Sequence, residues 1–89
     1  MIRRHYVFSG WVQGVGFRWR AKNAASLWGC TGWVRNEWDG TVTMELQGLE
    51  AQLDRVLAAI ADSRYIRIET IESRDIPVDP DERGFRTIY

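Results

Sequence analysis

TGWVRNEWDGTVTMEL, residues 31–46, is the part of the chain that indicates its fold most clearly. Thr31–Asn36 has the composition of a strand. After it, two sets of side chains alternate between opposite faces: Val42, Met44 and Leu46 against Thr41, Thr43 and Glu45. Asp39-Gly40 separates the two runs, and Asp-Gly in this position is a strong signal for a β-hairpin. The centre of the chain is therefore predicted to be two antiparallel strands.

A helical repeat of apolar residues lies on each side of this hairpin. Before it, the apolar positions are Phe17, Ala21, Ala24, Ala25 and Trp28, which places Trp28 in the expected core. After it, they are Leu49, Leu53, Val56, Leu57 and Ile60. We expect the first helix to stop at Gly29 and the second near residues 62–63. Each helix has one apolar stripe, so each is expected to cover a sheet face.

The outer segments complete the pattern. Residues 4–12 are rich in Tyr, Val, Phe and Trp, which is strand composition. Residues 66–70 alternate as a fourth strand, and Ile71 breaks the alternation, so the chain either continues to Ile76 with a bulge or fades into a loop. Residues 84–89 form a short last strand in this reading. The order predicts an α+β, ferredoxin-like βαββαβ sandwich, an antiparallel sheet with two helices on one face. The whole chain, residues 1–89, is expected to be a single domain.

Composition limits the classes of function. Twelve basic and twelve acidic side chains cancel, and nonspecific nucleic-acid binding usually needs excess positive charge, so no nucleic-acid partner is expected. The longest apolar stretch, residues 56–61, is too short to cross a membrane. Cys30 is the only cysteine, which excludes an internal disulfide and a Cys-rich zinc site. An unpaired thiol suits a reducing compartment, so we expect a cytoplasmic protein.

The loop between the first strand and the first helix is the candidate site. In Gln13-Gly14-Val15-Gly16-Phe17-Arg18, two glycines allow successive backbone N–H groups to converge on one point. The helix start adds unpaired N–H donors, and Arg18 can donate two parallel hydrogen bonds to a phosphate or carboxylate. The alternative is that the glycines only make a turn and that Arg18 is solvated.

Asn36 is a second candidate, at the end of the strand that enters the hairpin turn. Asparagine is common at such positions because it bonds nearby backbone, so a purely structural role is the alternative. The single histidine, His5, is expected to be structural or exposed, and no residues have metal-ligand spacing, so no metal site is predicted.

Two motifs together give a more specific signal than either alone. GWVQGVGFR at residues 10–18 resembles the first signature of the acylphosphatases, G-x-V-Q-G-V-x-F-R, and residues 32–42 resemble the second, G-W-V-x-N-x-x-D-G-x-V. The resemblance covers essentially the whole chain. It departs from the family at Cys30, Met44 and Thr87, positions that concern packing.

The resemblance implies a small hydrolase of acyl phosphates that needs no cofactor, expected to act as a monomer on a small-molecule substrate. By this resemblance, Arg18 binds the phosphate and Asn36 positions the attacking water. The backbone amides of Val15, Gly16, Phe17 and Arg18 hold the phosphate oxygens, and Gln13 and Gly14 shape the loop. The alternatives from other classes are a domain that binds phosphate or carbamoyl phosphate with slow turnover, and an RNA-binding module.

Several side chains outside these motifs have expected environments. Cys30 is expected to be a small buried apolar residue and Trp19 to be partly exposed near the loop. The Arg3-Arg4 pair is expected on a solvated strand face. Against the RNA-binding alternative, Val42, Met44 and Leu46 stand on the third strand, where RNA-binding domains of this kind carry aromatic residues that stack on bases.

Overall fold

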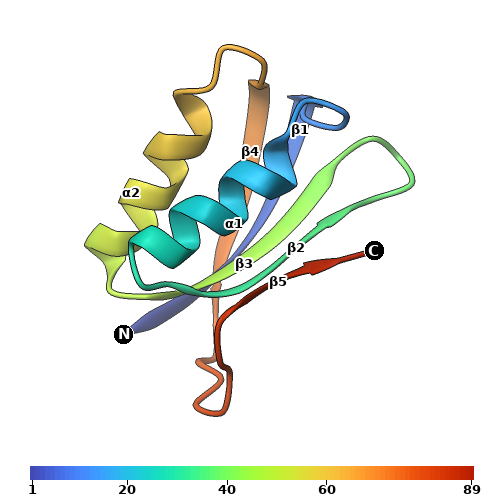
Figure 1. Cartoon of the computed structure of the whole chain (residues 1–89). Helices are drawn as coiled ribbons and strands as arrows, with labels where there is room; N and C mark the ends of the chain where they lie inside the picture. Colours follow the sequence, from blue (N-terminus) through green and yellow to red (C-terminus); the bar gives the residue numbers. More distant parts are fainter.

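The computed structural model describes residues 1–89 and has the predicted order of elements (Figure 1). The elements are β1 (Ile2–Trp11), α1 (Phe17–Leu27), β2 (Thr31–Asn36), β3 (Val42–Gly48), α2 (Glu50–Ala61), β4 (Arg67–Ile76) and β5 (Phe85–Ile88). β4 does continue to Ile76, and Ile71 stays paired with Phe8. The register of the two strands shifts between Ser9, paired with Thr70, and Gly10, paired with Ile68. The extra residue, Glu69, is therefore a bulge in β4, two residues before Ile71.

One five-stranded sheet, in the order β4-β1-β3-β2-β5, forms one layer of the molecule. The four longer strands pair antiparallel, as the ferredoxin-like prediction requires. β5 differs, because it pairs parallel to β2 and makes the sheet mixed. The chain leaves β4 at the end of the sheet where β2 begins, so a segment that returns along β2 must run in the same direction (Figure 1).

The hydrophobic core lies between the sheet and the two helices, which cover the same sheet face (Figure 1). Seventeen buried residues form a single cluster. Phe17, in the first turn of α1, packs against Phe8 of the central strand β1, with ring centroids 4.9 Å apart. Full burial of one such side chain contributes about 1.5–3 kcal/mol, so this contact holds the beginning of α1 against the sheet.

Trp28 is not part of this core, contrary to the helical pattern. α1 ends at Leu27, and Trp28 is the residue that caps it, so its side chain leaves the apolar stripe. The ring is 36% exposed and packs under the guanidinium of Arg55, 5.2 Å from the ring centroid. Cys30 is buried as expected, and burial raises the pKa of its thiol.

The opposite sheet face is partly covered by residues 77–84, the loop between β4 and β5. Gln47 exchanges two hydrogen bonds with the backbone of Asp79, at 2.7 and 2.8 Å. Arg3 is 6% exposed and forms ion pairs with Glu45 and Glu82, so the prediction of a solvated Arg3 is wrong. Alternation along a strand gives the face of a side chain, but not what covers that face.

The contribution of Glu45 to the stability of the fold depends on pH. Burial opposes its ionisation, but hydrogen bonds from His5, at 2.6 Å, and from Arg3 hold the pKa of Glu45 below its ordinary value of 4.5. Its ionised form therefore stabilises the fold above pH 4.5, and this contribution is lost as the pH falls through the lowered pKa.

We expect the advantage of the wild type over Glu45→Gln in unfolding free energy to shrink between pH 7 and pH 3, because only the wild type has this carboxylate to protonate. Urea unfolding of both proteins at each pH measures the difference. An advantage that stays constant over this range would contradict the assignment.

Candidate active site

The loop between β1 and α1 forms one wall of a cavity of about 450 Å³. Gly14 and Gly16 have positive φ angles of 73° and 80°, whereas φ of Val15 between them is not positive. Alternation of this kind turns successive N–H groups toward one side of the backbone. A Cβ atom at either glycine would meet nothing within 4 Å, so the glycines serve the backbone conformation and not close packing.

The N-terminus of α1 is open toward a ligand. The first hydrogen bond of the helix runs from Arg20 N–H to Gly16 O at 3.0 Å, so three earlier N–H groups of the helix have no partner within it. No side chain caps the helix, and its first turn holds no acidic residue. These donors and the positive end of the helix dipole favour an anion.

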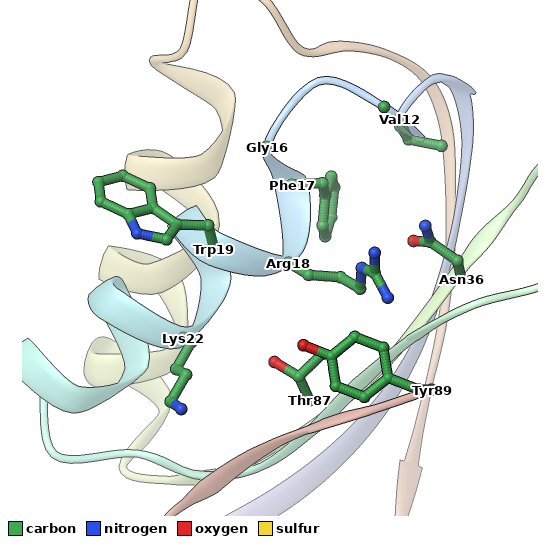
Figure 2. A pocket seen from close by; sticks show the side chains of 10 residues that line it. Val12, Gly16, Phe17, Arg18, Trp19, Lys22, Asn36, Thr87 and Tyr89 are labelled. Atoms are coloured by element: carbon green, nitrogen blue, oxygen red, sulfur yellow. The ribbon is translucent and has the colours of Figure 1, made fainter.

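Arg18 extends from this first turn toward Asn36 (Figure 2). Its guanidinium carbon lies 5.1 Å from the centroid of the Tyr89 ring. Arg18 belongs to none of the six ion pairs of the molecule, so no carboxylate neutralises it. Its five N–H donors therefore remain available for an anionic ligand.

Asn36, the last residue of β2, faces Arg18 across the cavity (Figure 2). Its side-chain oxygen is buried and has no hydrogen-bond partner in the protein. A buried polar atom without a partner is costly, and such atoms concentrate where a ligand or water completes the bonding. The structure thus brings together Arg18 and Asn36, two residues that are 18 positions apart in the sequence.

Gln13 explains how the loop and the hairpin come to lie side by side. Its side-chain amide donates to the carbonyls of Glu37, at 2.7 Å, and Thr41, at 2.9 Å, both in the turn between β2 and β3. Its side chain does not line the cavity, and Val15 packs against the core instead. Of the predicted loop residues, Gly14, Gly16, Phe17 and Arg18 line the cavity.

Five further side chains complete the walls of the cavity, one of them the buried Val12. Trp19 lies there, 72% exposed, as expected from its position near the loop. Sequence reasoning missed Lys22, although its spacing of four residues from Arg18 on a helix is a signal that could have found it. It also missed Thr87 and Tyr89, which reach the cavity because β5 lies beside β2.

No group of three His, Cys, Asp or Glu side chains is placed to hold a metal ion. No helix is long and apolar enough to span a membrane. The polar groups at the cavity are backbone amides and the side chains of Arg18, Asn36, Lys22, Thr87, Tyr89 and Trp19.

Comparisons with known proteins point to one family. The sequence profile of the family Acylphosphatase matches residues 4–87. The chain is 41% identical over 91 residues to an acylphosphatase of Clostridium acetobutylicum, with both chains covered completely. It is similar to the crystal structure of acylphosphatase from Bacillus subtilis, with a TM-score of 0.91 and 28% identity over the whole of both chains. It is also similar to part of full-length HypF in a phosphate- and nucleotide-bound form, with a TM-score of 0.87 and 27% identity, covering 99% of this chain and 12% of that one.

Proposed function

The chain belongs to the acylphosphatase family and hydrolyses acyl phosphates, and we propose that Arg18, Asn36 and the loop at residues 13–18 carry out this reaction without a metal ion. The observation that carries the proposal is the arrangement across the cavity. An unpaired guanidinium and an uncapped helix N-terminus lie on one side, and the unpartnered Asn36 oxygen lies on the other.

In this proposal the phosphate oxygens accept hydrogen bonds from the backbone amides of residues 15–18, while Gln13 and Gly14 keep the loop in shape. Arg18 donates two parallel hydrogen bonds to the same phosphate. These donors are fixed before the substrate binds, because Phe17 is packed against Phe8 and Gln13 is bonded to the hairpin turn. Preorganised donors stabilise the charge on the equatorial oxygens without further rearrangement.

The remaining step is attack by water on phosphorus, in line with the departing oxygen. The Asn36 oxygen accepts a hydrogen bond from this water and aims it. The leaving group is a carboxylate with a pKa of about 4, which departs without a proton, so the reaction needs no general acid. An oxygen of the substrate's own phosphate takes the proton of the water, so no protein base is needed either.

We propose further that residues 1–89 work as a single domain, as a monomer, in the cytoplasm and without a nucleic-acid partner. One core cluster, an unpaired buried Cys30 and a net charge of zero support this assignment. The apolar residues of β3 are buried under the helices, so they offer no surface on which bases could stack. Light scattering that gives the mass of a dimer would contradict the monomer.

Hydrolysis of benzoyl phosphate in the presence of EDTA, by wild type and by Asn36→Ala, tests this proposal. We expect metal-independent turnover by the wild type and a fall in kcat of about 10²-fold in the variant, because the water is no longer aimed. Inhibition by inorganic phosphate should be unchanged. Asn23→Ala, which changes the chain's other asparagine, is the matched control.

Three results would contradict different parts of the proposal. Folded protein that binds phosphate without turnover above the spontaneous rate would favour a phosphate-binding module. Activity lost in EDTA and restored by a divalent cation would contradict the metal-free reaction. Asn36→Ala with the wild-type kcat would remove Asn36 from the mechanism.

A further inference from the structure

Lys22 is the only lysine of the chain, and its exposed side chain lines the cavity one helical turn after Arg18. Side chains spaced four residues apart on a helix lie on one face, with Cβ atoms about 5–6 Å apart. Like Arg18, Lys22 forms no ion pair. None of the ten residues that line the cavity is acidic. The cavity therefore carries two positive charges that no acidic side chain neutralises.

The two cations lie in different parts of the cavity. Arg18 points toward Asn36, whereas Lys22 extends on the side away from Asn36, below Trp19 (Figure 2). Lys22 is also more than one turn beyond the N-terminal amides, since α1 begins at Phe17. In the proposed function, the loop amides and Arg18 satisfy the phosphate. The position of Lys22 is thus suited to the other end of the substrate.

The side chains around Lys22 indicate which kind of acyl group would fit there. The exposed indole of Trp19 and the exposed ring of Tyr89 offer flat apolar surfaces at the cavity. An ammonium group is a flexible point charge that attracts an anion without demanding a fixed geometry. An acyl group with a hydrocarbon body and a negative end would match both features.

We infer that Lys22 gives this enzyme a preference for acyl phosphates whose acyl group carries a second negative charge, such as the monoacyl phosphates of dicarboxylic acids. The inference rests on the proposed function, because it assumes that the phosphate lies against the loop and Arg18. Lys22 makes no contact with the reacting atoms. It determines specificity through the charge of the acyl group.

A matched pair of substrates, benzoyl phosphate and 4-carboxybenzoyl phosphate, tests the inference, because they differ only in a remote carboxylate. We expect Lys22→Gln to lower kcat/KM for the carboxylated substrate by about twofold to fivefold, the range of an exposed ion pair, and to leave that for benzoyl phosphate unchanged. The loss should lie in KM, because the ion pair forms equally in the ground state and the transition state. Lys22→Glu should cause a larger loss for the carboxylated substrate. In the wild type, 0.5 M NaCl should reduce the ratio of kcat/KM for 4-carboxybenzoyl phosphate to that for benzoyl phosphate.

Arg83→Gln, which removes one exposed positive charge that does not line the cavity, controls for net charge and should leave kcat/KM for both substrates unchanged. An equal loss of both substrates in Lys22→Gln would overturn the inference, because Lys22 would then serve the phosphate or the fold. An unchanged ratio of the two kcat/KM values would overturn it as well. Failure of the proposed function is distinct, because the wild type would then hydrolyse neither substrate.

Discussion

Arg18→Ala is expected to lower kcat/KM for benzoyl phosphate by about 10²–10³-fold, the usual cost of removing one preorganised donor to developing charge. Arg18 is the only guanidinium that lines the cavity, and no carboxylate shares it. The backbone amides of the loop remain in the variant, so some activity above the spontaneous rate should persist. Steady-state kinetics of the two proteins measure the ratio.

Arg18→Lys separates charge from geometry. A lysine keeps the positive charge, but it cannot make two parallel hydrogen bonds to one phosphate. We therefore expect Arg18→Lys to lower kcat/KM markedly, although the charge at the site is unchanged. Unfolding by urea should be nearly unchanged in both variants, because Arg18 takes part in no ion pair of the fold. Near-normal activity of Arg18→Lys would contradict the two-bond contact with the phosphate.

Arg3→Met is expected to lower the free energy of unfolding by about 3–5 kcal/mol, the cost of removing one partner from a buried ion pair. Nε and Nη2 of Arg3 bond Glu45 at 3.2 and 3.0 Å. Nη1 and Nη2 bond the two carboxylate oxygens of Glu82 at 2.7 and 3.0 Å, and Nη1 also bonds Gln47 at 3.2 Å. All five donors of Arg3 are therefore used.

The loss in Arg3→Met comes mainly from two carboxylates left close together without their cation. Adding Glu82→Gln to Arg3→Met should therefore recover part of the stability, since one uncompensated charge disappears. Arg83→Met is the matched control, because it changes an exposed arginine next to Glu82 in the loop at residues 77–84. A loss below about 1 kcal/mol in Arg3→Met would show that the network behaves as an exposed surface pair.

The sequence predicts most of the fold because its signals are local. The Asp39-Gly40 turn specifies the hairpin, and the apolar repeats on either side specify two one-sided helices. The wrong prediction of a buried Trp28 has the same origin, because the apolar repeat includes Trp28 and does not show that the helix ends at Leu27. Likewise, residues 84–89 are predicted to form a strand, but the sequence does not show that this strand pairs parallel to β2.

The motifs predict Arg18 and Asn36 as site residues, but they do not predict which other side chains lie beside them. That both residues line one cavity depends on the hydrogen bonds of Gln13 to the hairpin turn. Tyr89 reaches the cavity only through the pairing of β5 with β2. The buried environment of Arg3 likewise depends on a loop almost 80 residues away in sequence, which no local pattern reveals.

In the proposed reaction, water aimed by Asn36 attacks the phosphorus held by Arg18 and the loop. Hydrolysis of benzoyl phosphate by the wild type in H₂¹⁸O with EDTA, followed by mass spectrometry of both products, identifies the atom that the water attacks. Attack on phosphorus predicts that ¹⁸O enters inorganic phosphate and that benzoate stays unlabelled. Label in the benzoate would mean attack on the carbonyl carbon, and would contradict the mechanism.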